Sequence, residues 1–285
     1  RLRMPTVTTN TAANSALRFL NYNSAQSSSS VSKLASGSRI VKASDDAAGL
    51  AIGTRLMADV NVLRQAQTNA SQGASVLQVA DGGLARIGDV LQRMKTLAAQ
   101  SLSGVPTDAE RAFIDAEYQE LINEIDGIAE STRFNGESLL DGTSAQFGGP
   151  VDFFVGTDAA DVITVDLTAI STTAKNFTVT GLALETSEVT DTTTATAAMG
   201  LVDTALDTIS EARANVGALI SRFEFREQQI ATSIENIDAA KSAIMDVDLA
   251  AEQSQLVSSQ VLVQAAVSAL SQANQIPQSL LKLLQ

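Results

Sequence analysis

Asp45 and Asp46 are adjacent acidic residues in the segment Lys42–Gly49. Paired carboxylates can act as a general acid and a general base, so this pair is the first candidate for catalysis. A helix capped by Ser44 offers a simpler explanation, because the first turn of a helix favours negative charge. We therefore interpret the pair as part of a helix start and not as an active site.

A second group of carboxylates, Asp246, Asp248 and Glu252, has a spacing loosely similar to that of a calcium-binding loop. Such a loop also needs a central glycine and a further acidic ligand between Asp248 and Glu252, and both are missing here. We interpret the group as a turn between helices.

Two glycine pairs, at 82–83 and 148–149, lack the lysine and hydroxyl residue of a phosphate-binding loop. The glycine at 83 is instead expected to allow two helices to approach closely.

Residue types that most enzymes need are absent. The 285 residues include no histidine and no cysteine. Without them the chain cannot form a Ser-His-Asp triad, a thiol nucleophile, an HExxH zinc site or a disulfide. Composition leaves carboxylate catalysis and Ca²⁺ or Mg²⁺ sites open, but neither acidic group above favours them. We predict no enzyme activity, no catalytic or metal-binding residue and no cofactor.

Charge is distributed unevenly along the chain. The net charge is −13, and a chain without a basic stripe is a poor candidate for binding nucleic acid or anionic lipid. Residues 141–208 hold ten acidic residues and a single base, Lys175. We expect this middle segment to face bulk solvent.

Both ends of the chain carry almost no charge. Residues 4–38 contain two charged side chains, and so do residues 249–285. Glutamine or serine interrupts every apolar run before it reaches the length of a membrane span, so we predict no membrane insertion. The start of the chain lacks the apolar region of a signal peptide. Such uncharged ends are expected to find partners, and to fold only when they assemble.

Apolar residues recur every seven positions in both halves of the chain, the spacing of helices that pack side by side. The N-terminal series comprises Leu56, Leu63, Ala70, Leu77, Leu84, Leu91 and Ala98. The C-terminal series comprises Val216, Phe223, Ile230, Ile237 and Ile244, and a further series follows at Leu249, Leu256, Val263 and Leu270. Because the step between these two is five residues, we predict a hinge or domain junction at Asp246–Asp248.

A separate helix is predicted after the turn signal at Ser103–Pro106. Thr107 and Glu110 have the spacing of a capping box. An amphipathic stripe follows at Ile114, Tyr118, Leu121, Ile125 and Ile128.

The apolar period changes to two in the middle of the chain. Val151–Val155, Ile163–Leu167 and Phe177–Val179 predict two or three short strands, and Thr186–Thr196 predicts a loop. The fold class that follows is mainly α. It is a long coiled coil and helix bundle built from both chain termini, with a small β-hairpin in the middle. An ordinary coiled-coil dimer is the alternative, but its seam normally has charged neighbours.

Several local motifs resemble those of bacterial flagellins. Lys33–Leu56 (KLASGSRIVKASDDAAGLAIGTRL), Leu91–Ser101 and Ser131–Gly142 are similar to motifs of the flagellin N-terminal region. Ser242–Leu256 and Gln272–Gln285 are similar to motifs of the C-terminal region, and Val155–Leu167 resembles the short hairpin of the family. The motifs occur in the family order, so the chain is identified as a member by resemblance.

The resemblance implies a structural subunit that self-assembles into the bacterial flagellar filament, for swimming motility. Residues 1–38 and 249–285 would form the inner coiled-coil core, residues 39–141 and 197–248 the helical outer tube, and residues 142–196 a short surface-exposed segment. Core packing would fall to Leu249, Leu256, Val263 and Leu270. Outer packing would fall to Leu56, Leu63, Leu77, Leu84, Leu91, Val216, Phe223, Ile230, Ile237 and Ile244.

The partners of the family follow as expectations. The chain would bind itself as a helical homopolymer and meet the flagellar export apparatus, an export chaperone, the filament cap and the hook-junction proteins. It would reach the extracellular filament without a cleavable signal peptide. Met4 matches the usual family start, so Arg1–Arg3 would come from an upstream start codon or from added residues.

Arg93, Leu97 and Glu117 match family positions that vertebrate Toll-like receptors read on the monomer. The alternative is that Leu97 simply packs, while Arg93 and Glu117 are solvated or pair between subunits. Both interpretations stay open, as does O-glycosylation of the serines and threonines in residues 143–196.

Two other functions remain as alternatives. One is a junction protein between hook and filament, which shares the terminal helices. The other is a filament-borne surface protein that binds glycans through residues 143–196. A zinc peptidase inserted into the filament protein, as some flagellins carry, is excluded by the absence of histidine.

Overall fold

The computed structural model describes residues 10–171 and 176–283, the last eight of these by backbone only. Met4 and Lys175 lie outside the described residues. The contacts between residues divide the chain into two units, residues 1–58 with 236–285 and residues 59–235.

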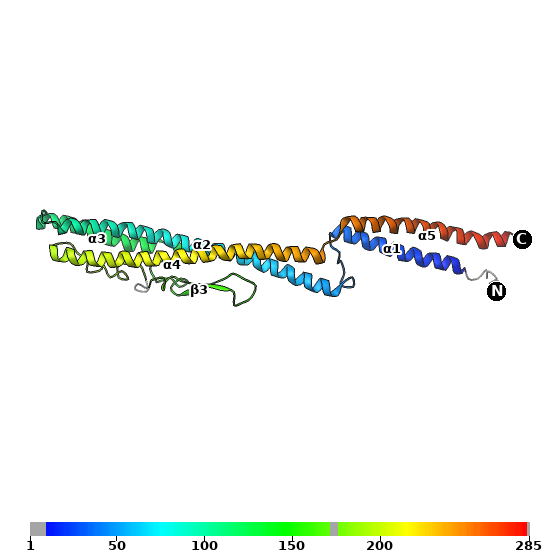
Figure 1. Ribbon diagram of the computed structural model, residues 1–285, viewed down its shortest axis with the longest axis horizontal. Coiled ribbons are helices and arrows are strands. Elements are labelled where there is room, and N and C mark those ends of the chain that lie inside the picture. The colour runs from blue at the N-terminus through cyan, green and yellow to red at the C-terminus, as the bar shows by residue number, and fades with distance from the viewer. Residues whose placement is uncertain (1–9, 172–175, 284–285) are drawn as a thin grey trace. The chain divides into compact units, whose positions relative to one another are not determined.

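Helices make up most of the described chain, which confirms the mainly α prediction (Figure 1). Within the described ranges they are α1 (Thr11–Ser36), α2 (Ala47–Leu102), α3 (Asp108–Ser131), α4 (Thr192–Met245) and α5 (Leu249–Leu283). The chain leaves the helical conformation between the last two helices at Asp246–Asp248, where a hinge or domain junction was predicted, although the two units divide between 235 and 236. Asp248 begins α5, because its Oδ1 accepts hydrogen bonds from the backbone N–H groups of Ala250 and Ala251, at 2.9 and 3.1 Å.

The unit 59–235 is a bundle in which α3 and α4 lie along α2 (Figure 1). Two ion pairs show that α4 runs antiparallel to α2: Asp81 pairs with Arg213, and Lys95 pairs with Asp203. The seven-residue series meet in its core. The following members are buried: Leu63, Leu77, Leu84, Leu91, Val216, Phe223 and Ile230. Leu56, Ile237 and Ile244 belong to the other unit and are half-buried there.

The start of α3 has the predicted capping box, in which the Thr107 N–H donates to Glu110 Oε2 at 2.7 Å. The predicted apolar stripe is only partly right. Tyr118 and Ile125 are fully buried, but Ile114, Leu121 and Ile128 are half-buried. The buried face is rotated toward Arg111, Ile122 and Ala129.

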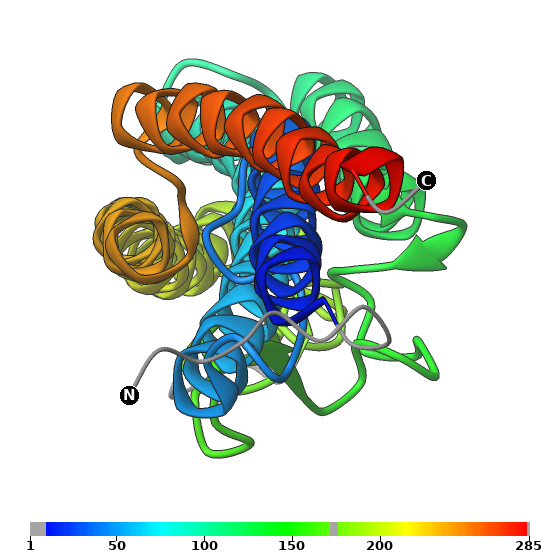
Figure 2. The same cartoon turned by 90° about the vertical axis from the view of Figure 1, so that its right-hand side faces the viewer.

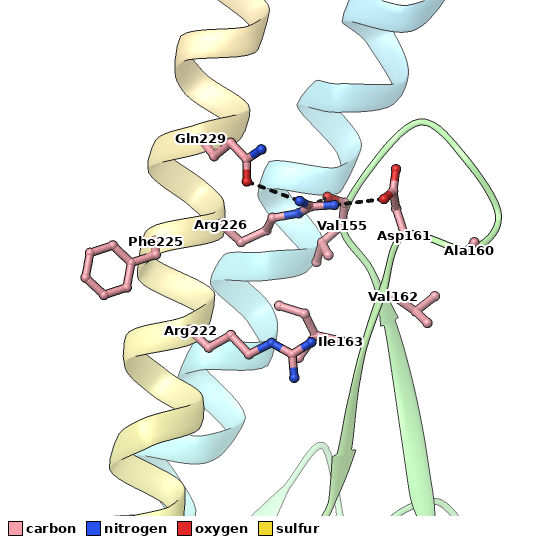
Figure 3. A pocket seen from close by; sticks show the side chains of 9 residues that line it. All are labelled: Val155, Ala160, Asp161, Val162, Ile163, Arg222, Phe225, Arg226 and Gln229. Carbon is pink, nitrogen blue, oxygen red and sulfur yellow. Dashed lines mark hydrogen bonds and ion pairs between the residues drawn. The ribbon is translucent and has the colours of Figure 1, made fainter.

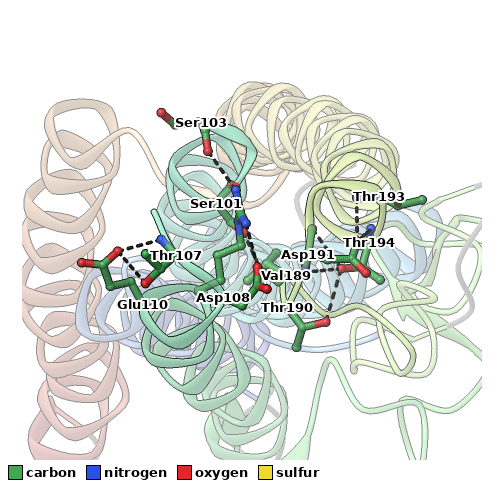
Figure 4. Close-up of polar contacts among 11 residues, drawn as sticks. Ser101, Ser103, Thr107, Asp108, Glu110, Val189, Thr190, Asp191, Thr193 and Thr194 are labelled. Atoms are coloured by element: carbon green, nitrogen blue, oxygen red, sulfur yellow. Dashed lines mark hydrogen bonds and ion pairs between the residues drawn. The ribbon is translucent and has the colours of Figure 1, made fainter. Parts of the chain in front are cut away.

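Arg111 explains part of this rotation. It is only 9% exposed, and its guanidinium donates to the carbonyl oxygens of Ser101 and Ser103, at 2.9 and 3.1 Å. Ser101 in turn donates to the carbonyl of Val189 at 2.6 Å (Figure 4). A polar cluster therefore joins the end of α2, the start of α3 and the segment before α4.

The predicted hairpin is present: β3 (Pro150–Phe154) pairs antiparallel with β4 (Val162–Asp166), and Phe153 lies opposite Ile163. Phe153 packs edge-to-face against Phe223 of α4, with 5.5 Å between ring centroids. This contact fixes the hairpin to the bundle.

The predicted third strand, Phe177–Val179, is wrong. Both side chains are buried, but the backbone forms bends and turns. Their N–H groups are used elsewhere: Phe177 donates to the carbonyl of Leu140 at 2.8 Å, and Val179 donates to Asp126 Oδ1 at 2.7 Å. The predicted loop Thr186–Thr196 ends early, because α4 begins at Thr192.

A second hairpin was missed by the sequence analysis. β1 (Arg133–Phe134) pairs with β2 (Glu137–Ser138) around Asn135 and Gly136, whose φ angles are 52° and 86°. Two positive φ angles are typical of a type I′ turn, for which Asn-Gly is the strongest sequence signal.

In the unit 1–58 with 236–285, α1 and α5 lie side by side (Figures 1 and 2). The Asn10 side chain donates to the carbonyl of Ala273 at 2.8 Å, and Lys33 lies 3.9 Å from Glu252. Because the start of α1 contacts the later part of α5 and the end of α1 contacts the start of α5, the two helices are antiparallel.

Candidate assembly surfaces

The contact between α1 and α5 follows a heptad pattern on both helices. Among the described side chains of α5, those that are not exposed are Glu252, Leu256, Ser259, Val263, Ala266, Leu270 and Ala273. On α1 a series with the same alternating spacing of three and four is likewise not exposed: Ala13, Ala16, Leu20, Asn23, Ser27, Ser30 and Leu34. Ser15, Gln26, Ser29 and Lys33, beside this series, are also half-buried. The pattern is that of an antiparallel coiled coil.

Small residues make up much of this seam. Ala13, Ala16, Ser27 and Ser30 of α1 lie in it, and so do Ser259, Ala266 and Ala273 of α5, so the seam buries little apolar area. The Ser30 hydroxyl is fully buried and has no hydrogen-bond partner among the described atoms. Both properties predict a pair that is weakly stable by itself.

Large apolar side chains of both helices lie away from the seam. On α1 the exposed ones are Leu17, Phe19, Tyr22 and Val31, of which Phe19 and Tyr22 are 63% and 68% exposed. On α5 they are Leu249, Val257, Val261, Leu262 and Val267. A groove of about 720 Å³ runs between Phe19 and Tyr22 on one side and Leu262 and Ala269 on the other. Because water contact with such residues is unfavourable, these faces are candidate contacts with further chains.

The four predicted core residues do not share one environment. Leu256 is buried in the seam, and Val263 and Leu270 are half-buried there. Leu249 is 59% exposed and lies outside the seam. Ser259, Ala266 and Ala273 were not predicted to lie in the seam, because each falls three residues after a member of the predicted series and is small.

α5 also bears on the prediction of no membrane insertion. Judged by length and mean hydropathy alone, the segment Leu249–Gln275 could cross a bilayer. Serine and glutamine residues interrupt its apolar runs. A helix that is buried by neighbouring protein chains passes the same test, so this is weak evidence for a membrane.

Asp45 and Asp46 stabilise the local backbone, but the predicted helix cap at Ser44 is wrong. α2 begins at Ala47, so Asp46 and not Ser44 is its cap: Asp46 Oδ1 accepts from the Gly49 N–H at 2.9 Å. Asp45 Oδ2 accepts from the N–H groups of Val41 and Lys42, at 3.2 and 3.0 Å. The Lys42 hydrogen bond is the main reason that the pKa of Asp45 lies below its usual value. Both carboxylates therefore shape the backbone.

The second acidic group likewise holds local structure. Asp248 caps α5, and Asp246 accepts from the Ser242 hydroxyl at 2.6 Å. Within the described residues, no cluster of three or more acidic side chains is placed to hold a metal ion.

Arg93 and Glu117 form an exposed ion pair between α2 and α3. Arg93 Nη2 and Nε lie 2.6 and 2.9 Å from Glu117 Oε1, and the two side chains are 55% and 47% exposed. Leu97 is only 2% exposed and packs in the bundle core. The structure therefore brings the two charged residues together on the surface and leaves Leu97 beneath them.

A second pocket lies between the β3–β4 hairpin and α4, with a volume of about 320 Å³ (Figure 3). Arg226 closes one side of it. Its guanidinium donates to the carbonyl of Val155 and to Asp161 Oδ1, both at 3.0 Å. Arg222 and Phe225 line the pocket from the preceding turn of α4.

Comparison with known proteins agrees with this architecture. The family model described as the bacterial flagellin N-terminal helical region matches residues 7–145, and the C-terminal helical region matches residues 199–284. A flagellin of Halalkalibacterium halodurans is 38% identical, over 96% of this chain and 98% of that protein. A flagellar filament core protein of Brachyspira hyodysenteriae is 33% identical, over 98% of this chain and 99% of that protein.

A solved structure with low sequence identity is similar to this chain in fold only. A putative flagellar hook-associated protein from Vibrio parahaemolyticus superposes with a TM-score of 0.57 at 14% identity, over 71% of this chain and 100% of that chain. Because both flagellin regions are matched and the relatives align over nearly their whole length, the chain belongs to the bacterial flagellin family.

Proposed function

We propose that this flagellin is a structural subunit of the bacterial flagellar filament and that it polymerises through the helices at its two ends. One observation carries the proposal: the large apolar side chains of α1 and α5 lie outside the seam that joins them. Each square ångström of apolar surface that neighbouring copies cover contributes about 25 cal/mol. Assembly therefore stabilises helices that the small-residue seam holds only weakly.

The layers of the filament follow from this proposal. Residues 1–38 and 249–285 form the inner core, residues 39–141 and 197–248 form the outer tube, and residues 142–196 face outward. Contacts within the monomer divide the chain at other points, between 58 and 59 and between 235 and 236. That division describes packing in a single copy, whereas the proposed layers describe packing among many copies.

Substitution on α5 tests the assembly mechanism. Leu256→Asp and Val263→Asp place a charge in the seam, and Leu262→Asp places one in the groove. All three are expected to abolish polymerisation, because a buried unpaired charge is strongly unfavourable. Gln253→Asp adds the same charge at an exposed position and serves as the control. Normal filaments from the three variants, seen by electron microscopy, would refute the proposal.

Amide hydrogen exchange tests whether the ends fold on assembly. In the dilute monomer, α1 and α5 are expected to exchange quickly, while residues 59–131 are protected. Both helices are expected to become protected in the filament. Strong protection of α1 and α5 in the monomer would contradict folding on assembly, although polymerisation itself could still occur.

The same function sets the location and the remaining partners. The subunit acts outside the cell, leaves it through the flagellar export apparatus with an export chaperone, and meets the filament cap and the hook-junction proteins. We assign it no catalytic role. Pull-down with purified export chaperone tests one of these contacts, and the mass of filament isolated from cells tests glycosylation of residues 143–196.

Receptor recognition is a second candidate function, favoured by the exposure of Arg93 and Glu117. Arg93→Ala and Glu117→Ala are expected to weaken activation of a vertebrate Toll-like receptor reporter by the monomer. Leu97→Ala would act indirectly, through packing. Arg86→Ala, an exposed arginine on the same helix, is the control. Equal activation by all variants would rule out a role for the ion pair.

A further inference from the structure

Arg222 is an exposed arginine in the pocket beside the β3–β4 hairpin (Figure 3). Arg226, one turn later, donates hydrogen bonds to Val155 and Asp161 of the hairpin and to Gln229 of its own helix, whereas Arg222 makes no hydrogen bond or ion pair with any described residue. Phe225 of the same helix also lines the pocket, and its ring is 71% exposed and points away from the hairpin in Figure 3. The pocket thus offers a free guanidinium, with an exposed aromatic ring at its edge.

An acidic stripe runs along the exposed face of α3. Residues 108–131 contain eight acidic residues and one base, Arg111, which is buried. Spacing of three and four places Glu110, Phe113, Glu117, Glu120 and Glu124 on the exposed face, opposite the buried one. Two of these carboxylates already have partners within the chain, Glu110 in the capping box and Glu117 in the ion pair with Arg93. Phe113 is 77% exposed, and Glu120 and Glu124 have no ion-pair partner among the described residues.

We propose that the Arg222 pocket of one copy receives the acidic stripe of α3 from a second copy. A guanidinium can bind a carboxylate through two parallel hydrogen bonds, which gives such a contact both strength and direction. The exposed phenylalanines, Phe225 beside the pocket and Phe113 in the stripe, supply apolar area to the same contact. The inference rests on the proposed function, namely that the chain polymerises.

Two physical arguments favour this partner. Each copy has a net charge of −13, so copies repel one another unless acidic surfaces are placed against basic groups. Arg222, which has no acidic partner among the described residues of its own chain, can provide such a basic group for the acidic stripe. The pocket and the stripe are also different surfaces of one unit. A contact between unlike surfaces repeats from copy to copy, and it generates a filament when the rotation between successive copies does not close a ring.

Charge reversal tests the contact directly. Arg222→Glu alone and Glu124→Arg alone are each expected to raise the critical concentration for polymerisation about tenfold or more, because like charges then meet across the contact. Both substitutions in one chain restore an opposite-charge pair and should recover most of the loss. Arg86→Glu and Glu130→Arg make the same changes of charge at exposed positions outside the pocket and the stripe, and should have little effect. Circular dichroism checks that every variant is folded.

The outcomes separate this inference from the proposed function. If Arg222→Glu polymerises like the unchanged chain while Leu262→Asp does not, the inference fails and the proposed function stands. If the folded double variant polymerises no better than the single variants, α3 is not the occupant of the pocket. If the unchanged chain never polymerises, the proposed function itself fails.

Discussion

The guanidinium of Arg39 donates two hydrogen bonds to the carbonyl oxygen of Ile244, 3.2 Å from Nε and 2.9 Å from Nη2. That carbonyl lies in the last turn of α4, where carbonyl groups lack partners within the helix and a cation is favoured. Two backbone hydrogen bonds lie beside it, from the Arg39 N–H to Met245 and from the Val247 N–H to Gly37. The segment that leaves α1 is therefore tied to the segment that enters α5.

Arg39→Ala should loosen this tie. We expect a local loss of about 1–2 kcal/mol, because a hydrogen bond to a charged group contributes about 1.5–3 kcal/mol and the exposure of Arg39 to solvent lowers this contribution. Hydrogen exchange at Ile244–Val247 in the monomer should become faster, while the melting of residues 59–235 stays unchanged. Arg55→Ala, an exposed arginine of the same unit, is the control. Unchanged exchange in Arg39→Ala would mean that the backbone hydrogen bonds suffice.

The adjacent glycines of α2 should respond to alanine in opposite directions. A Cβ at Gly83 would lie 2.5 Å from Thr132 Oγ1 and 2.7 Å from Leu140 Cδ1, whereas a Cβ at Gly82 has no neighbour within 4 Å. Gly82→Ala is expected to raise the free energy of unfolding by up to about 1 kcal/mol through helix propensity. Gly83→Ala is expected to lower it by about 1–3 kcal/mol through overpacking. Urea denaturation of the monomer measures both, and equal effects would contradict the close approach.

A buried polar pair holds the segment before α4 against α3. The hydroxyl oxygens of Tyr118 and Ser187 are 2.5 Å apart, and the side chains are 0% and 3% exposed. Burial raises the pKa of Tyr118, so its phenol stays neutral and able to donate. Tyr118→Phe should cost about 1–3 kcal/mol, because it leaves the Ser187 hydroxyl unsatisfied.

The double variant of this pair is the informative control. Tyr118→Phe with Ser187→Ala removes both hydroxyls and should cost less than the sum of the single changes. Urea denaturation of all four chains gives the coupling free energy. A coupling near zero would show that each hydroxyl finds another partner.

The core of α2 was predicted well, because a seven-residue repeat places apolar residues on one face of the helix and this face is the one that is buried. The α1–α5 seam was only half predicted. Its large members, such as Leu256, were found, but Ser259 and Ala266 look like surface residues in sequence. Conversely, Phe19 and Tyr22 look like core residues and are exposed in the monomer. The pattern does not show which apolar face meets the same chain and which meets another.

The remaining errors have local causes. Phe177 and Val179 alternate like a strand, but their N–H groups bond to Leu140 and Asp126. The Arg222 pocket was not predicted at all, because it depends on how the hairpin lies on α4. Contacts far apart in sequence decide both features, and no local spacing reports them.

Acid should destabilise the helix starts, and Asp191 tests this. Its Oδ1 accepts from the N–H groups of Thr193 and Thr194, at 2.7 and 2.8 Å, where α4 begins. These hydrogen bonds, chiefly that from Thr194, hold the pKa of Asp191 below its usual value. The pKa of Glu110 is lowered in the same way by the Thr107 N–H.

A lowered pKa in the folded state means that the unfolded state binds the proton more readily. The stabilisation is therefore present above the unfolded pKa of about 4 and is lost as pH falls through the folded value.

The melting temperature, followed by circular dichroism, should thus be flat above about pH 5 and fall below about pH 4. Asp191→Asn keeps a side chain that can cap the helix but cannot titrate in this range. Its melting temperature should be slightly lower at neutral pH and should fall less steeply in acid, because one of the protons taken up on unfolding is removed. Parallel curves for the two chains would show that the Asp191 carboxylate does not contribute to the acid transition. Glu124→Gln, at an exposed position within α3 that has no ion pair among the described residues, controls for the loss of one negative charge.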